Sequence, residues 1–250
     1  EMSPEKKMSK RQAMRAKRER QARMQRLGVI GIIVVGALLV AAALIYPNLK
    51  PVGDIVTTDA GEHPMANDNA MGDPNAPIKI EEFSDFQCPY CARFHEETEW
   101  QLANSYVADG TVYLVYRSFG DFIGSESKAA AEAAYCAGDQ DKFWDYHNIL
   151  FANQTGENVG AYSDRRLGAF AEALSLDMDA FNDCFSSGKY SDRVNQDKVD
   201  GTAAGVTGTP AFSITYTVNG EQKQRFIAGA YPFSEFQTQI EGALVEMGLK

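Results

Sequence analysis

The feature that most constrains this chain is a run of twenty uncharged residues, Leu27–Tyr46 (LGVIGIIVVGALLVAAALIY). As an α-helix rising about 1.5 Å per residue, it spans about 30 Å, the thickness of the hydrocarbon core of a bilayer. A buried helix of a soluble domain is seldom apolar on all sides over such a length. We therefore predict a single transmembrane helix at residues 28–46.

The segment before this run is basic: residues 1–27 carry ten Lys or Arg side chains and three acidic ones. Because positive charge marks the cytoplasmic side of a membrane helix, we expect a cytoplasmic tail at 1–27. The remainder then lies outside the cytoplasm, anchored to the cell membrane by a single pass. A signal peptide cleaved after Ala43 is the alternative, although both the basic segment and the apolar run exceed the usual signal-peptide lengths.

The rest of the chain is acidic, since the whole chain has a net charge of −10 despite its basic tail. Phosphate contacts need clustered Lys and Arg, so this body is not expected to bind nucleic acid. The lipid bilayer is the partner that the tail and the apolar run predict.

Residues 47–72 are interrupted by Pro, Gly and Asn, which predicts an extracytoplasmic linker before a folded domain at 73–250. Within this domain the periodicity of apolar residues predicts an α/β fold. The Asn219-Gly220 pair predicts a hairpin turn. The expected elements are strands at 78–84 and 111–119, a helix at 88–107, helices through 122–205, strands at 211–218 and 223–228, and a final helix from 233.

The motif Cys88-Pro89-Tyr90-Cys91 follows a predicted strand and begins a helix. Pro89 suits the first helical turn, and the unpaired N–H groups there favour a thiolate at Cys88. A redox pair is the favoured interpretation. A structural disulfide and half of a zinc site are the alternatives, but zinc needs about four ligands and no second paired motif is present. We expect no metal and no cofactor beyond the redox-active pair.

Three stretches together resemble the DsbA-like branch of the thioredoxin superfamily: EEFSDFQCPYCARFHEET, AAYCAGDQDKFWDYHNILF and GVTGTPAF. The resemblance covers roughly residues 73–250. It implies a thioredoxin-like fold with a helical insertion at about 122–205, preceded here by the transmembrane helix. The sequence CPYC departs from the CPHC of the best-known members and lacks the His that helps to stabilise their thiolate.

The resemblance also implies the roles of five residues. Cys88 would be the exposed nucleophile and Cys91 its buried partner. Pro210 would be cis, with Thr209 beside the active site. Glu82 occupies the position of a buried acid that relays protons to Cys91, a solvent-facing strand residue being the alternative.

Three further residues carry weaker signals. Cys136 and Cys184 have no cysteine nearby, and such residues commonly pair in an oxidising compartment, so we expect a structural disulfide between them. Two free thiols or a second redox centre are the alternatives. His95 follows Cys88 by seven residues and lies on the same helix face. We expect it to pack or hydrogen-bond at the helix surface rather than to tune Cys88.

These features predict an extracytoplasmic thiol–disulfide oxidoreductase that introduces disulfides into exported proteins. Its partners would be protein or peptide thiols and, as the family implies, a membrane quinone-linked thiol oxidase that reoxidises the pair. The alternatives are a disulfide reductase or isomerase, and an accessory subunit of a larger membrane complex.

Overall fold

The computed structural model describes residues 10–49, 52–58 and 63–250. The chain divides into two compact units, with the boundary after residue 51. The first contains one helix, α1 (Lys10–Leu49), of 40 residues. Its segment Lys17–Ala43 is long and apolar enough to cross a membrane, and the side chains of residues 17–43 are exposed. The predicted apolar helix is therefore present, continuous with the basic segment before it.

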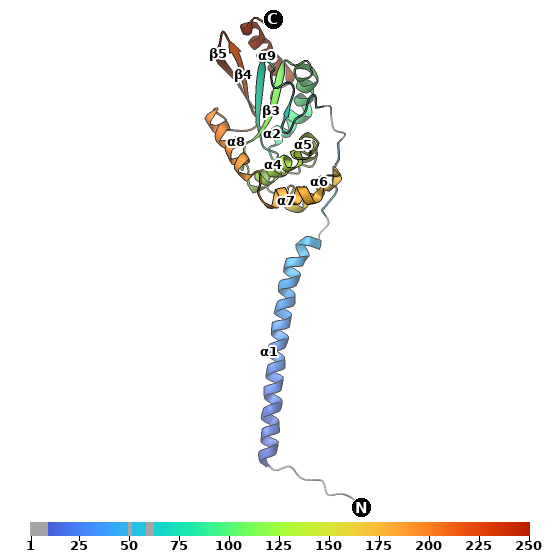
Figure 1. The fold of residues 1–250 in the computed structure, drawn as a ribbon. Helices are drawn as coiled ribbons and strands as arrows, with labels where there is room; N and C mark the ends of the chain where they lie inside the picture. Colours follow the sequence, from blue (N-terminus) through green and yellow to red (C-terminus); the bar gives the residue numbers. More distant parts are fainter. Residues whose placement is uncertain (1–9, 50–51, 59–62) are drawn as a thin grey trace, which may run out of the picture. The chain divides into compact units, whose positions relative to one another are not determined.

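The second unit is an α/β domain whose elements follow the expected order (Figure 1). Its strands are β1 (Ala70–Met71), β2 (Ile78–Ser84), β3 (Val112–Ser118), β4 (Ala211–Val218) and β5 (Glu221–Ala228). Its helices are α2 (Pro89–Phe94), α3 (Trp100–Leu102), α4 (Ser125–Gly138), α5 (Phe143–Ala152), α6 (Asp164–Ala173), α7 (Met178–Ser186), α8 (Ser191–Ala203) and α9 (Phe233–Met247). Two π-helical segments, His95–Glu99 and Ala103–Val107, continue α2 and α3.

The strands form one sheet in the order β1-β3-β2-β4-β5. β2 and β3 are parallel, whereas β4 runs antiparallel to both β2 and β5. The helices α4–α8 interrupt the sheet between β3 and β4, as the predicted insertion requires. Asn219 and Gly220 have positive φ angles of 51° and 84°, the conformation that a tight hairpin turn needs and that these residue types tolerate.

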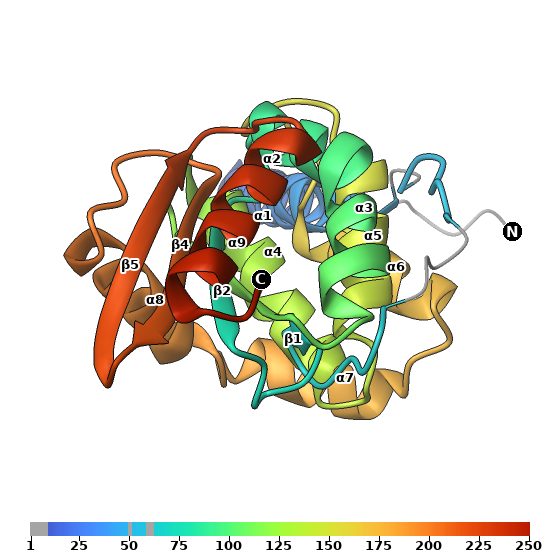
Figure 2. The ribbon, with the colours of Figure 1, turned by 90° about the horizontal axis from the view of Figure 1, so that it is seen from above.

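Aromatic rings join the sheet to the helices on one of its faces. Phe94 of α2, Phe212 of β4 and Phe236 of α9 lie with ring centroids 4.5 to 5.4 Å apart. All three side chains are buried, and each such ring contributes apolar contact area as well as a favourable tilted geometry. Figure 2 shows α9 and α3 side by side, which is consistent with their packing in this layer.

The expected linker at 47–72 differs from the structure at both ends. α1 continues to Leu49. On the other side, the Val56 N–H donates to Asn153 Oδ1 (2.9 Å), and β1 pairs with β3 as a buried edge strand. The reason is local: the peptide groups of this segment find hydrogen-bond partners on the domain, and Ala70 and Met71 bury apolar surface there.

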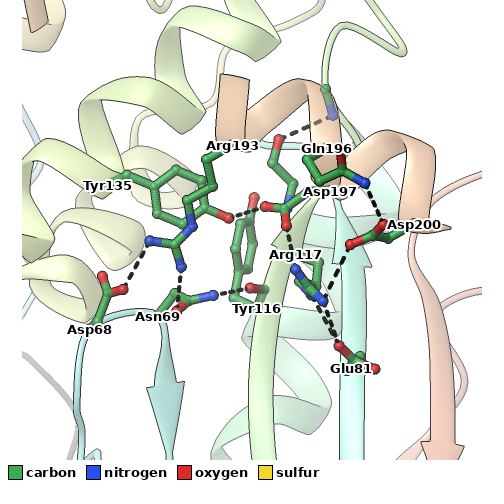
Figure 3. Close-up of polar contacts among 12 residues, drawn as sticks. Asp68, Asn69, Glu81, Tyr116, Arg117, Tyr135, Arg193, Gln196, Asp197 and Asp200 are labelled. Atoms are coloured by element: carbon green, nitrogen blue, oxygen red, sulfur yellow. Dashed lines mark hydrogen bonds and ion pairs between the residues drawn. The ribbon is translucent and has the colours of Figure 1, made fainter. Parts of the chain in front are cut away.

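A polar network fastens α8 to the sheet (Figure 3). Asp197 of α8 is 1% exposed, and it accepts hydrogen bonds from Arg117 Nη1 of β3 (2.6 Å) and from the hydroxyl of Tyr135 on α4. Arg193, one turn earlier in α8, pairs with Asp68 (3.0 Å) and Asn69 (2.7 Å) beside β1. The buried carboxylate is thus paired, as burial of a charge requires.

A disulfide joins Cys136 of α4 to Cys184 of α7, with Cα atoms 5.8 Å apart and a sequence separation of 48. It lies within the helical insertion, where both half-cystines are buried. A covalent link across such a loop reduces the entropy of the unfolded chain.

We predict that the double variant C136A/C184A unfolds at lower urea concentration than the wild type. The expected loss in free energy of unfolding is about 2–4 kcal/mol, as is typical when a native disulfide is removed. Urea titrations followed by circular dichroism, without reductant and with the Cys88–Cys91 pair held oxidised in both proteins, measure it. Coincident unfolding curves would contradict a stabilising role for the bridge.

Candidate active site

Two neighbouring strands bring the halves of the site together. β2 and β4 are antiparallel, with Phe83 opposite Ala211, so the end of β2 meets the beginning of β4. Cys88 follows β2, and its sulfur lies 3.4 Å from the carbonyl oxygen of Thr209, to which it donates only when protonated. The peptide bond between Thr209 and Pro210 is cis. The residues that the resemblance assigned to one site therefore lie together.

Cys88 is the residue that precedes α2, with extended backbone angles of φ −73° and ψ 120°. Pro89 follows in the first turn, where the missing N–H removes no helical hydrogen bond. Hydrogen bonding from the Cys91 thiol, assisted by the N–H groups of Cys91 and Tyr90, lowers the pKa of Cys88 to about 6 against the opposing effect of burial. Cys88 is therefore mainly a thiolate at neutral pH.

Cys91 has the opposite electrostatic environment. Its side chain is fully buried, and the N–H of Asp85 donates to its sulfur at 3.5 Å. Burial, followed by the proximity of Cys88, raises the pKa of Cys91 well above its usual value. Both cysteines are free thiols in this structure. One member of the pair thus holds negative charge easily, while the other retains its proton.

The expectation of an exposed nucleophile needs correction, because Cys88 is only 5% exposed. The loop that contains Thr209 covers the sulfur, which it contacts through the backbone carbonyl. Cys88 remains more accessible than Cys91, which is 0% exposed. The surface between α2 and this loop lies beside the Cys88 sulfur.

That surface is a groove. A cavity of about 410 Å³ is lined by Thr209, Tyr90 and Arg93 of α2, and by residues 228–231 after β5. Tyr90 and Tyr231 are exposed by 57% and 50%. Arg93 donates to the carbonyl of Ala230 (3.0 Å), which ties α2 to the opposite wall. Exposed aromatic rings beside a reactive sulfur provide apolar contact area for a peptide.

Glu82 is buried, with 1% of its surface exposed, so the solvent-facing alternative is wrong. The strand alternation places it on the same apolar face of β2 as Ile80. Burial, with a further contribution from the negative charge of Glu99, raises the pKa of Glu82 well above its usual value. Its Oε2 has no hydrogen-bond partner among the described residues. The buried Tyr116 hydroxyl lies close enough to Glu82 and Cys91 for both to raise its pKa, after the larger effect of burial.

His95 belongs to a second polar cluster, behind the cysteines. Its Nδ1 lies 3.1 Å from Glu99 Oε2, and Nε2 of His147, from α5, lies 3.8 Å from the same oxygen. Burial opposes ionisation of Glu99, but the charged forms of His147 and His95 outweigh it and lower the pKa of Glu99 to about 2. At neutral pH the stabilising partner is His95, which hydrogen-bonds to Glu99, because His147 is uncharged there. Burial lowers the pKa of His147 to about 4, so this ring is neutral at pH 7.

His95 therefore hydrogen-bonds at its helix, as expected, but its partners were not predicted. The spacing of His95 and Glu99 by four residues is a helical contact signal. No local signal connects them to His147, which lies 48 residues after Glu99 in sequence. These three are the side chains in the described part of the chain whose ligand atoms gather closely enough to hold a metal.

Comparison with known proteins agrees with this architecture. Residues 65–241 match the protein-family model described as Thioredoxin. The protein named probable disulfide bond formation protein D of Bacillus anthracis is 27% identical over 199 residues, which are 77% of this chain and 88% of that protein. The Na(+)/H(+) antiporter NhaA 1 of Salinispora arenicola is 29% identical over 184 residues, 73% of this chain. This chain spans only 26% of that antiporter's length.

Two solved structures share the fold. BdbD from Bacillus subtilis in its oxidised form has a TM-score of 0.62 at 21% identity, covering 77% of this chain and 100% of that one. The α-DsbA1 protein of Wolbachia pipientis has a TM-score of 0.63 at 23% identity, covering 74% and 95%. The predicted thioredoxin-like fold with a helical insertion is confirmed.

We predict that iodoacetamide alkylates reduced Cys88 with a pH midpoint near 6, because that is the pH at which its thiolate forms. Since the Cys91 thiol contributes most to lowering this pKa, C91A should shift the midpoint upward, toward about 8.5. C91S keeps a hydrogen-bond donor and serves as the matched control. Rates measured from pH 4 to 9 by mass spectrometry test this, and an unshifted midpoint in C91A would refute the assigned cause.

Proposed function

The chain belongs to the thioredoxin family, and we propose that it is a DsbA-like thiol–disulfide oxidoreductase, anchored in a membrane by α1, that oxidises exported proteins. The observation that carries this proposal is the unequal pair at the start of α2. Cys88 has a lowered pKa and Cys91 a raised one. A thiolate that is stable in the reduced protein makes the disulfide form a ready electron acceptor.

The proposed reaction begins from the oxidised pair. A substrate thiolate attacks the sulfur of Cys88, the Cys88–Cys91 bond breaks, and Cys91 leaves with the electron pair and takes up a proton. A second substrate thiolate then attacks the substrate sulfur of this mixed disulfide, and Cys88 leaves as a thiolate. The substrate gains one disulfide and loses two electrons, which the pair now holds as two reduced sulfurs. The low pKa of Cys88 makes it a good leaving group in the second step.

The groove beside Cys88 is the proposed substrate site. An extended peptide that lies between Tyr90 and Tyr231 would pass Thr209 and present its cysteine to the Cys88 sulfur. The main supports are the cavity of about 410 Å³ and the exposure of these two rings. After exchange, a membrane quinone-linked thiol oxidase would accept the two electrons from the reduced pair.

We expect the Cys88–Cys91 pair to have a reduction potential near about −120 mV, the value of a strongly oxidising pair. The full-length chain in detergent is equilibrated in glutathione buffers, and its free thiols are counted by mass after alkylation. Reduction of this pair alone raises the number of free thiols per chain from zero to two. Reduction of the Cys136–Cys184 bridge as well would raise it to four, so the mass distinguishes the two pairs. A potential near about −270 mV would instead indicate a reductase.

We further propose that Glu82 exchanges a proton with Cys91. Burial raises the pKa of Glu82 well above its usual value, so Glu82 holds its proton to a higher pH than an ordinary carboxyl and can donate it when Cys91 leaves as a thiolate. The burial of both groups supports this role, because water has little access to Cys91. Glu82 is thus assigned as the local acid of the exchange.

We predict that E82Q slows oxidation of a peptide dithiol by at least about 100-fold at neutral pH, the lower range for loss of a general acid. In the wild type this contribution is present below the raised pKa of Glu82 and is lost as the pH rises through it. The E82Q profile should lack that decline. Stopped-flow fluorescence measures the rates, with E81Q as control, because Glu81 is only partly buried and pairs with Arg117 (3.0 Å). A wild-type pH profile in E82Q would exclude Glu82 as the acid.

A further inference from the structure

The cluster of His95, Glu99 and His147 supplies no reacting group to the exchange reaction proposed above. His95 and Glu99 are the first and last residues of the π-helical segment that continues α2, and His147 lies in α5. Their ligand atoms, one from each residue, all lie within 4.8 Å of one another. Two imidazoles and one carboxylate from two separate helices thus converge on one point.

The protonation of His147 leaves a lone pair directed at this point. Its Nδ1 lies 3.2 Å from Oδ1 of Asn148, an acceptor, so the ring hydrogen of the neutral imidazole belongs on Nδ1. Nε2 is then an acceptor, and it is fully buried without a hydrogen-bond partner among the described residues. It faces the Glu99 carboxylate, a second acceptor, at 3.8 Å. A cation between the two would satisfy both.

The spacing of these atoms suits a small divalent ion. Zinc binds His nitrogen and carboxylate oxygen at about 2.0–2.2 Å, which separates neighbouring tetrahedral ligands by about 3.3–3.6 Å. The observed separations from Glu99 Oε2 are 3.1 Å to His95 and 3.8 Å to His147, and no two of the three ligand atoms are more than 4.8 Å apart, so the set would contract around a bound ion. Asn148 would provide the outer hydrogen bond that fixes the ring of a metal-binding His.

The surroundings leave one side of the cluster open. The rings of Phe86, Trp144 and Phe151 lie 4.9 to 5.6 Å from that of His147, so this part of the cluster is enclosed by aromatic side chains. The His95 side chain is 21% exposed, so the cluster reaches the solvent on this side.

We propose that His95, Glu99 and His147 form a binding site for a divalent first-row transition metal, with zinc as its natural occupant. Nitrogen and oxygen ligands without sulfur fit Zn²⁺ better than Cu⁺. The ion would link the π-helical segment His95–Glu99 to α5 of the insertion. In the chain these two elements are separated by α3, β3 and α4. This site contains neither Cys88 nor Cys91.

The test uses the full-length chain in detergent, purified without a polyhistidine tag, stripped of metal by a chelator and held with Cys88–Cys91 oxidised. Oxidation removes both thiolates as competing ligands. Zn²⁺ is titrated against a chromogenic chelator, and Co²⁺ is added separately, because its visible spectrum reports coordination. We expect one Zn²⁺ per chain, a rise in the thermal midpoint with Zn²⁺, and tetrahedral Co²⁺ bands without a sulfur charge-transfer band.

The variants H95Q and E99Q should each weaken Zn²⁺ binding by at least about tenfold, since even outer-shell partners commonly contribute that much. E97Q removes the same charge from an exposed position two residues from Glu99, and it should bind as the wild type does. If E99Q or H95Q fails to fold, as judged by circular dichroism, the wild-type stoichiometry and Co²⁺ spectrum decide. Unsaturable binding by the wild type, or equal affinities in E99Q and E97Q, would overturn the proposal.

Discussion

The antiparallel pairing of β2 with β4 is the constraint on which the site depends. It sets Phe83 opposite Ala211 and so brings the residues after β2 to those before β4. Neither segment alone makes a site: Cys88 comes from one and Thr209 from the other, 121 residues apart. The helical insertion occupies much of the intervening chain, yet the register of the two strands maintains the contact. A shift of one residue would turn every side chain of a strand to the opposite face.

Burial acts differently on the ionisable groups behind this contact because their partners differ. Cys88 and Cys91 are both buried, but Cys88 has the helix N–H groups and the Cys91 thiol as donors, whereas burial dominates at Cys91. The carboxyl groups divide in the same way. Neighbouring imidazoles lower the pKa of Glu99 in spite of its burial, while burial and the Glu99 charge raise the pKa of Glu82. Charge in this core is thus decided by hydrogen-bond donors and neighbouring charges rather than by depth alone.

Local patterns in the sequence were sufficient to predict those features that depend on neighbouring residues. The apolar run predicts a long helix, the Pro after Cys88 predicts the start of a helix, and the Asn219-Gly220 pair predicts a hairpin turn. Each of these signals lies within one short stretch of sequence. β1 was not predicted, because a strand of two residues, Ala70 and Met71, is too short to show the alternation of apolar and polar side chains that indicates a strand. α8 lacks the regular spacing of apolar residues that indicates a helix. Its position depends instead on Asp197 and Arg193, which bind groups on elements distant in sequence. The contact of His147 with Glu99 likewise exists only after α5 packs against the segment behind Cys88.

The bridge between Cys136 and Cys184 imposes a condition on how this protein matures. A newly made chain carries four thiols, of which two must be joined permanently while the other two must keep cycling between open and closed states. Folding must therefore keep the two pairs apart, because a bridge from either insertion cysteine to Cys88 or Cys91 would close the reactive pair and leave the insertion open at once.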